Sequence, residues 1–327
     1  GDAADRNLRR WALGLAAAGA AALALGAVFR PERTWVNLLL VAYLLAGCGL
    51  GGAFFLAFQG VSGARWSLSL VPVAQRLAHT LPWTALAAGG LAAGGMTWYP
   101  WAQEAIPQAA SFWFKNAWFT PGFFLARTTA YVLIWAALGR WMASSHWRCE
   151  PACDGQSSGG RPGRSALALV LLSVSVCLAG VDWVMSLEPL WFSTMFGVVQ
   201  FAGVFLSGLA AIVLLAAWQQ QLGSSSQRLS TRTLHDLGKL LFAFSCFWMY
   251  IWFSQYMLIW YVNIPEESVY YVRRMQGLWW PLALLNVALN WAVPFVTLLP
   301  RPAKQSWWVM TRIAIVILVG RWLDLYL

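Results

Sequence analysis

The chain has 327 residues, of which 60% are hydrophobic and only 10% are charged. A soluble domain carries about 25% charged residues, so this composition excludes an ordinary water-soluble protein and indicates a membrane protein. The net charge of +10 does not indicate nucleic-acid binding, because the basic residues are scattered between apolar segments instead of being gathered into one stripe.

Apolar stretches that are long enough to cross a bilayer, which takes about 20 helical residues, recur along the whole chain. They predict an all-α polytopic transmembrane protein with about nine spans: 11–29, 35–58, 81–98, 121–143, 166–186, 192–218, 237–261, 279–299 and 307–327. The first stretch follows three arginines, as a signal peptide would, yet it is long enough to span. The last stretch reaches Leu327 without a polar tail, so we expect further helix after it.

The connections between the spans predict the orientation in the membrane. Lys and Arg concentrate in the connections on the side of the N terminus, which places that terminus in the cytoplasm. The connections around 99–120, 187–191 and 262–278 are then outside. Residues 64–80 and 265–278 are predicted to form amphipathic helices at the inner and outer interfaces.

The five cysteines form no recognisable metal framework. Cys149 and Cys153 have a C-x₃-C spacing in a connection rich in Gly and Ser, and no second pair completes a four-ligand zinc site. Their role stays open between an ordinary loop, a disulfide and a metal site. The three His residues do not lie deep in a span, which argues against a haem held by two transmembrane His ligands. We expect this chain to bind no metal and no redox centre.

A short internal repeat indicates two related halves. The third and seventh spans each begin with a histidine, His79 and His235, and the fifth and ninth each carry a Gly followed by Trp and Asp, at 180–183 and 320–324. An offset of four spans gives a parallel repeat. The predicted organisation is a flanking transmembrane helix, a first four-helix bundle and a second four-helix bundle, over residues 1–34, 35–190 and 191–327.

Asp182 is the main candidate for chemistry. Ionisable groups inside a bilayer are costly and tend to be functional, and Asp182 follows a long uncharged stretch, with Ser186 on the same helix face. It is expected either to carry protons or to join two helices through a salt bridge to Arg127 or Arg274. Glu188 lies nearer the surface and is expected to be a helix-end carboxylate.

The seventh span is polar at both ends and apolar in the middle. Its polar residues are His235, Asp236, Lys239, Tyr250, Ser254, Gln255 and Tyr261. Two half-channels that meet at a dry middle would give this pattern, and so would an ordinary helix with interfacial ends. In the ninth span, Arg321 and Asp324 are spaced i, i+3 and are expected to pair with each other.

Two runs of the sequence point to a family. The runs 181–197 (VDWVMSLEPLWFSTMFG) and 252–267 (WFSQYMLIWYVNIPEE) strongly resemble the ActF subunits of bacterial alternative complex III, and the resemblance extends along nearly the whole chain. These subunits are related to the NrfD/PsrC membrane proteins. The resemblance implies ten spans, with two four-helix bundles flanked by single helices, and therefore a tenth span after Leu327.

The resemblance also implies a role in a quinol:electron acceptor oxidoreductase of the bacterial inner membrane. Quinol would be the substrate, and c-type haems and iron–sulfur clusters would be held by other subunits. A sister membrane subunit of the ActC type would be the better candidate for the quinol site. This chain would conduct protons, with Asp182 and the outer tyrosines of the seventh span on one side and its inner polar residues on the other. The alternatives are a quinone pocket in this chain, touched by His79 or Asp182, a secondary transporter, and a scaffold.

Overall fold

The computed structural model describes residues 2–64, 66–103, 117–144, 162–188, 191–221 and 229–327, and all regular elements in these ranges are helical. The bounds of the α-helices are α1 Asp2–Phe29, α2 Pro31–Ser62, α3 Val71–Gly94, α4 Pro100–Gln103, α6 Pro121–Ala143, α7 Pro162–Trp183, α8 Thr194–Gln221, α9 Thr231–Val262, α10 Pro265–Arg274, α11 Trp279–Val287, α12 Val293–Leu298 and α13 Trp307–Tyr326. The expected all-α architecture is confirmed for this part of the chain.

Six helical segments are long and apolar enough to cross a membrane, judged by length and composition: Pro31–Ser62, Pro121–Ala143, Pro162–Leu187, Thr194–Gln221, Thr231–Val262 and Trp279–Leu298. This repeated pattern is that of a multi-pass membrane protein. The three other predicted spans, 11–29, 81–98 and 307–327, lie mainly in α1, α3 and α13, which fall outside this criterion. The number of nine spans stays a prediction.

Local sequence signals set where the helices begin and end. Proline occupies the first turn of α2, α3, α6 and α10, where its missing N–H costs nothing. The hydroxyl of Ser230 accepts a hydrogen bond from the Thr233 N–H at 3.1 Å and caps the start of α9. Gly63 (φ 61°) and Asn263 (φ 50°) adopt the left-handed conformation that ends α2 and α9.

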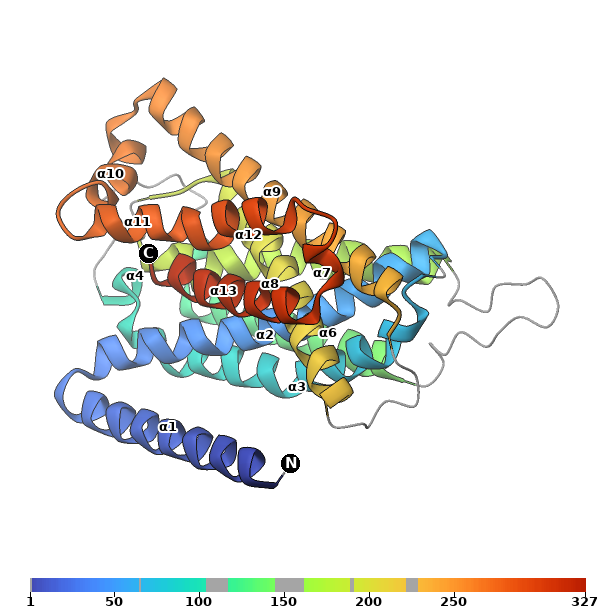
Figure 1. Ribbon diagram of the computed structural model, residues 1–327. Helices are drawn as coiled ribbons and strands as arrows, with labels where there is room; N and C mark the ends of the chain where they lie inside the picture. Colours follow the sequence, from blue (N-terminus) through green and yellow to red (C-terminus); the bar gives the residue numbers. More distant parts are fainter. Residues whose placement is uncertain (1, 65, 104–116, 145–161, 189–190, 222–228) are drawn as a thin grey trace.

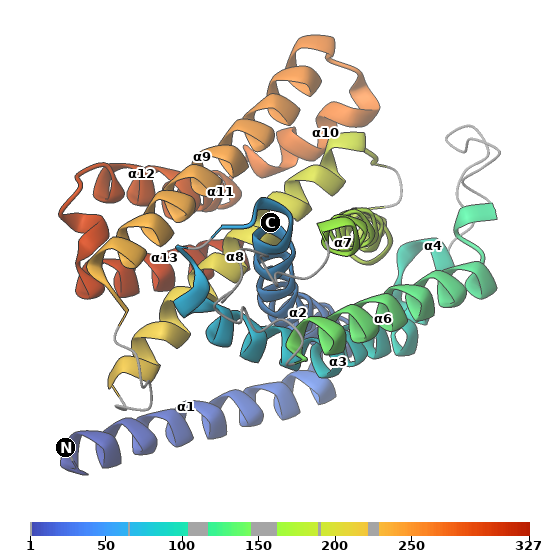
Figure 2. The ribbon, with the colours of Figure 1, turned by 90° about the vertical axis from the view of Figure 1, so that its right-hand side faces the viewer.

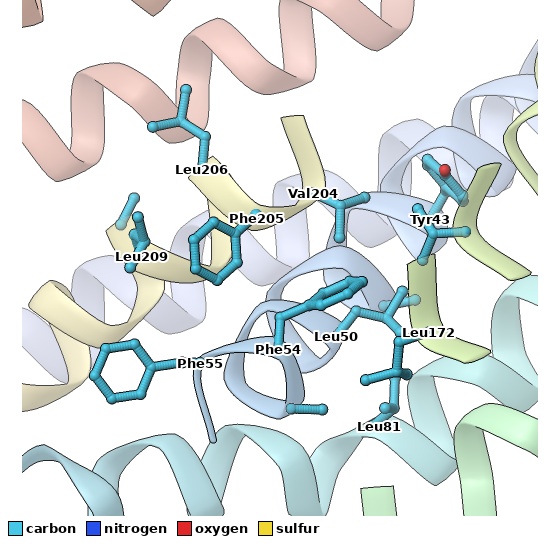
Figure 3. Packing of buried hydrophobic residues seen from close by; sticks show 14 of the residues in the cluster. Tyr43, Leu50, Phe54, Phe55, Leu81, Leu172, Val204, Phe205, Leu206 and Leu209 are labelled. Atoms are coloured by element: carbon cyan, nitrogen blue, oxygen red, sulfur yellow. The ribbon is translucent and has the colours of Figure 1, made fainter. Parts of the chain in front are cut away.

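The centre of the molecule is the crossing of α2 and α8. The two helices run in the same direction, because Gly47 faces Val204 and Gly51 faces Gly208 one turn further along both. A Cβ atom added to Gly51 would lie 2.2 Å from the Gly208 Cα, so only glycine permits this approach. Figure 3 shows Phe54 and Phe205 filling the space beside it, with ring centroids 6.1 Å apart.

The remaining helices pack around this pair. α3, α6 and α7 contact α2, whereas α9 and α13 contact α8. Figure 1 shows most of the long helices lying side by side, while the C-terminal half of α9 projects from the body and α10 leads the chain back to α11. Figure 2 shows α1 apart from the body along its whole length except the end that joins α2.

Two predicted elements differ from the structure. The amphipathic helix expected at 64–80 and the third span expected at 81–98 are largely one helix, α3, which begins at Val71 and ends at Gly94. Pro82 lies inside α3 without ending it. The eighth span is not a uniform helix, because a π-helical turn at Ala288–Ala292 separates α11 from α12.

Candidate functional site: two buried polar clusters

Asp182, at the end of α7, lies in a fully bonded ion-pair cluster. Its Oδ2 accepts hydrogen bonds from Arg127 Nε and from the Tyr131 hydroxyl, both at 2.8 Å. Its Oδ1 accepts from Arg127 Nη2 at 3.0 Å and from Trp118 Nε1 at 2.7 Å. The Asp182 side chain is 0% exposed and that of Arg127 is 9% exposed. The salt bridge to Arg127 is therefore the one of the two expected pairings that forms.

Aromatic side chains enclose this ion pair. The Arg127 guanidinium lies over the ring of Trp118, with Cζ 3.9 Å from the ring centroid, and also donates from Nη1 to the Trp118 carbonyl at 3.0 Å. The neighbouring Trp183 is buried and donates to the Thr128 hydroxyl at 3.1 Å. Because both carboxylate oxygens are occupied by donors, a proton could be added only at the expense of one of these bonds. The arrangement suits a lock between α6 and α7 better than a proton carrier.

A second buried cluster joins α13 to α11 and the π-helical turn. Arg321 Nη1 donates to Asp324 Oδ2 at 2.6 Å, which is the pairing expected from their spacing. The Asn286 amide donates to Asp324 Oδ1 at 2.8 Å, and the Asn290 amide donates to Asn286 Oδ1 at 2.7 Å. The Ser245 hydroxyl of α9 donates to the Asn290 carbonyl at 2.6 Å. A continuous chain of polar groups thus connects three spans.

Pro294 explains why these hydrogen-bonded polar groups come together at the π-helical turn. A proline inside a helix has no N–H to donate to the carbonyl four residues earlier, and its ring crowds that carbonyl. For Pro294 this carbonyl belongs to Asn290, which accepts the Ser245 hydroxyl instead. On the opposite side, Gly320 leaves room for the turn, because a Cβ there would lie 2.9 Å from Asn290 Nδ2. π-helical turns are frequent at functional sites.

The second cluster contains polar atoms without a hydrogen-bond partner among the described residues. They are Trp248 Nε1, Asn290 Oδ1 and Arg321 Nε. Gln200 Oε1 and Tyr43 OH are also unpartnered, but these two side chains lie beside Gly180 of α7, between the two clusters. The Arg321 guanidinium lies against α8 where Gly203 has no side chain, and its Cζ is 5.7 Å from the Trp248 ring centroid. Buried polar groups are nearly always hydrogen-bonded, to protein or to ordered water. This cluster therefore has unused capacity to bind water, in contrast to the Asp182 cluster.

A cavity of about 150 Å³ lies next to the second cluster. Its polar lining consists of Gln200, Asp324, Glu188 and Arg274, and its walls include Trp191 and Tyr270 among other apolar residues. Arg274 Nη2 donates to Glu188 Oε1 at 3.2 Å, so a surface ion pair flanks the cavity and the acid Asp324 lines it. The Trp191 and Tyr270 rings stack with centroids 4.0 Å apart. Asp324 thus contacts both the polar chain and a space that water can enter.

The polar residues at the start of α9 form a third group. Asp236 Oδ1 lies 2.6 Å from Lys239 Nζ and 3.9 Å from His235 Nδ1. Lys304, near the start of α13, packs against Gly238 and donates from Nζ to the Leu298 and Leu299 carbonyls. Between Gly238 and Ser245 lies the buried Leu241, over a distance of about 10 Å at 1.5 Å per residue.

Several sequence candidates lie away from both buried clusters. Tyr250 and Tyr261 are 65% and 82% exposed, and the Ser254 hydroxyl only donates back to the Tyr250 carbonyl. These three side chains are on the outward face of α9, whereas Asp182 is enclosed by α6 and α7. Among the described residues, Asp182 and these tyrosines therefore do not come together as the outer route that we expected.

The remaining candidates contribute locally. Ser186 is buried, and its hydroxyl donates to the Asp182 carbonyl. Gln255 is buried on the inward face of α9. His79 is exposed on α3, and neither it nor Asp182 lines the cavity described above. Cys149 and Cys153 lie outside the described residues, among which no group of three His, Cys, Asp or Glu side chains is placed to hold a metal ion.

Sequence reasoning missed the uncharged members of the second cluster. Asn286 and Asn290 are spaced i, i+4 in an otherwise apolar span, and amides inside a bilayer need partners. That spacing was the available signal. Gln200 and Tyr43, in the two central helices, gave no comparable signal because a single polar residue in a long apolar helix specifies no partner.

Comparisons with known proteins leave the family open. The chain matches no protein-family model, and a search of the curated proteins found no match either. The resemblance to the ActF subunits therefore stays a hypothesis that rests on the runs 181–197 and 252–267.

Proposed function

We propose that this chain is an integral membrane subunit of a quinol-oxidising complex of the alternative complex III type. It would sit in the bacterial inner membrane with its N terminus in the cytoplasm, beside an ActC-like sister subunit. Iron–sulfur and c-type cytochrome subunits would carry the electrons to the acceptor. The two sequence runs support this assignment, as do the apolar helices and the concentration of basic residues in connections on one side.

Within such a complex, the chain conducts protons through its second half. The observation that carries this proposal is the continuous polar chain Ser245–Asn290–Asn286–Asp324, which ends at a cavity and is surrounded by unpartnered polar atoms. Asp324 is the carboxylic acid in this row of hydrogen-bonded groups, and it contacts Arg321, Asn286 and the cavity. Water bound by the unpartnered atoms would connect these groups, because buried water bridges otherwise unsatisfied polar groups.

The route has an inner access and a dry middle. His235, Asp236 and Lys239 form the polar group at the start of α9, and Leu241 lies in the apolar turn between this group and Ser245. An apolar segment of nearly two helical turns stops a continuous leak of protons, which a complex that conserves energy must avoid. Protons would cross it only when the complex rearranges during turnover.

The two halves support an arrangement of related bundles. In the first half, Asp182 of α7 accepts hydrogen bonds from Arg127 of α6. In the second half, Asp324 of α13 accepts one from Asn286 of α11. Each aspartate is thus held by the preceding span, as a parallel repeat of two four-helix bundles in a nine-span or ten-span chain would require. The first half has kept a saturated ion pair, and the second half has an acid with access to a cavity.

A quinone pocket in this chain is less well supported. Pockets for small molecules usually enclose about 300–1,000 Å³, whereas the cavity beside Asp324 encloses about 150 Å³. This volume suits a few water molecules better than a quinone ring with its tail. We therefore assign quinol oxidation to the sister subunit and the cavity to proton transfer.

Affinity purification of the tagged chain from its native membrane tests the assignment to a complex. We expect co-purification of c-type haem, seen in the reduced-minus-oxidised absorbance spectrum, together with quinol oxidation by the eluate. A secondary transporter or a free-standing scaffold would elute without haem and without quinol oxidation, and that result would refute the proposal. A tagged unrelated polytopic membrane protein from the same membrane serves as the control for carry-over.

A further inference from the structure

The second half carries three cations at one end, of which the proposed proton route uses only Lys239. Lys239 lies in the third turn of α9, Arg301 follows α12, and Lys304 precedes α13. Lys304 packs against Gly238 of α9, one residue before Lys239, and Arg301 lies in the connection between α12 and Lys304, so all three are at this end of the bundle. We call Lys239, Arg301 and Lys304 the basic site.

The positive charge of the basic site is poorly compensated. Lys304 is only 9% exposed, and its ammonium bonds to the Leu298 and Leu299 carbonyls rather than to a carboxylate. Within the described ranges, Asp236 is the one acidic residue that forms ion pairs in this region, and its partners are Lys239 and His235. Burial and the nearby Lys239 lower the pKa of Lys304. An anion at this position would relieve both the repulsion between the cations and the cost of burying one of them.

An apolar surface continues from the basic site along the helices. Phe242 of α9 stacks on Phe295 of α12 with ring centroids 5.3 Å apart, and Lys304 Nζ is 5.8 Å from the Phe242 centroid. On the same helix α12, Val296 is 67% exposed, and Leu299, just after the helix, is 61% exposed. Cations above exposed aliphatic side chains have the polarity of a phospholipid, with the charged group at the interface and the tails below it.

The start of α13 indicates that this end of the helices lies at headgroup level. Trp308 is exposed, and the Arg312 guanidinium lies over its ring, with Cζ 3.4 Å from the centroid. Exposed Trp residues mark the boundary between the apolar core of a bilayer and its headgroups. Basic pockets between spanning helices at this level bind the headgroups of anionic lipids.

We propose that the basic site binds the phosphate of one anionic phospholipid, whose acyl chain lies along Phe242, Val296 and Leu299. An acidic protein segment is disfavoured as the occupant, because the exposed surface below the cations is aliphatic. The inference does not depend on the proposed role in quinol oxidation, since the lipid contacts only residues of this chain.

Native mass spectrometry of the full chain, purified in detergent with equal amounts of phosphatidylglycerol and phosphatidylcholine, tests this inference. We expect one phosphatidylglycerol molecule to be retained in preference to phosphatidylcholine. The double variant Lys239→Gln/Arg301→Gln should weaken its retention on the order of 25-fold, at about fivefold for each cation near a lipid surface. The charge-conserving variant Lys239→Arg/Arg301→Lys should keep it.

A matched control separates the basic site from the general charge of the protein. Arg76 and Arg140 are exposed cations at the same end of the first half, and the variant Arg76→Gln/Arg140→Gln should retain the lipid as the unchanged chain does. Equal loss in both double variants would overturn the assignment, as would equal retention of the two lipids. Displacement of the lipid by millimolar inorganic phosphate would also overturn it, since the apolar contacts would then contribute nothing.

Discussion

Replacing Asp182 with asparagine tests the most strongly bonded part of the molecule. The variant keeps the shape of the side chain but removes its charge, and it leaves the Arg127 guanidinium buried without a counter-ion. It also replaces one acceptor oxygen with an NH₂ group. This group is a donor, and it faces the donors of Arg127, Tyr131 or Trp118 that the oxygen had accepted from. Removing one partner of a buried ion pair costs about 3–5 kcal/mol, which is a large part of the stability of a typical domain.

The size of this effect can be judged against two internal comparisons. Asp236 pairs with Lys239, whose side chain is 58% exposed, and an exposed pair contributes only about 0–1 kcal/mol. Asp236→Asn should therefore leave stability almost unchanged. The double variant Arg127→Met/Asp182→Leu removes both charges and should recover part of the stability lost in Asp182→Asn, because an apolar pair of similar volume often replaces a buried ion pair without cost. The recovery is partial because the Tyr131 hydroxyl and the Trp118 indole lose their acceptor.

The assay is unfolding of the purified chain in mixed micelles of increasing sodium dodecyl sulfate, followed by Trp fluorescence. We expect a lower midpoint for Asp182→Asn than for Asp236→Asn, and a partly recovered midpoint for the double variant. If Asp182→Asn and Asp236→Asn had the same midpoint, the Asp182 carboxylate would not be a lock between α6 and α7. If the double variant were less stable than Asp182→Asn, the ion pair and its hydrogen bonds would stabilise the protein by more than is regained when the unpaired charge of Arg127 is removed.

Three further outcomes follow from the packing, the π-helical turn and α10. Gly51→Ala should separate α2 from α8 and cost about 1–3 kcal/mol, whereas Gly90→Ala, where a Cβ meets nothing within 4 Å, should be neutral in the same unfolding assay. Ser245→Ala should cost about 1–3 kcal/mol because the Asn290 carbonyl loses its donor; a neutral result would mean that another donor replaces it. Burial raises the pKa of Tyr270 from 10.0 to about 12. The contribution of this tyrosine to the stability is therefore fully present below the pKa of the unfolded chain, and it is lost as the pH rises from 10 to 12. Tyr270→Phe should lessen that loss without abolishing it, because burial also raises the pKa of the neighbouring Tyr271, and an unchanged pH profile would contradict the prediction.

The helices could be predicted well where an apolar run is bounded by proline or by a capping residue. α6 follows the predicted span 121–143, and α9 covers 237–261 with its cap at Ser230. The join between the predicted elements 64–80 and 81–98 was misplaced because Pro82 looks like a boundary in the sequence. Its packing among other helices lets α3 continue through it.

The candidate site could be predicted only where charge marks it. The sequence offered Arg127 and Arg274 as partners for Asp182, but charge alone does not choose between them; the fold directs Arg274 to Glu188 and to the Leu327 carbonyl. The contact between Asn286 and Asp324 joins residues 38 positions apart, and an amide gives no long-range pairing signal. The tyrosines of α9 were expected inside the protein, because a helical face in the sequence does not say which side is buried.

The two buried aspartates differ in a way that favours the second half as the site of proton transfer. Asp182 combines full burial with full bonding, which are the properties of a fixed structural pair. Asp324 combines an ion pair with a lining position in a cavity, and it is therefore the residue on which the proposed proton route depends. The two aspartates occupy similar places in the predicted repeat, so variants of the two can be compared within one chain.

Proton release per quinol oxidised, measured with the purified complex in liposomes, is the most direct test of the proposed proton route through Asp324. We predict that Asp324→Asn lowers proton release while Asp324→Glu largely keeps it, and that Arg127→Met/Asp182→Leu leaves proton release as it was in the unchanged complex. Full proton release by a folded, assembled Asp324→Asn complex would contradict the proposed route through the second half.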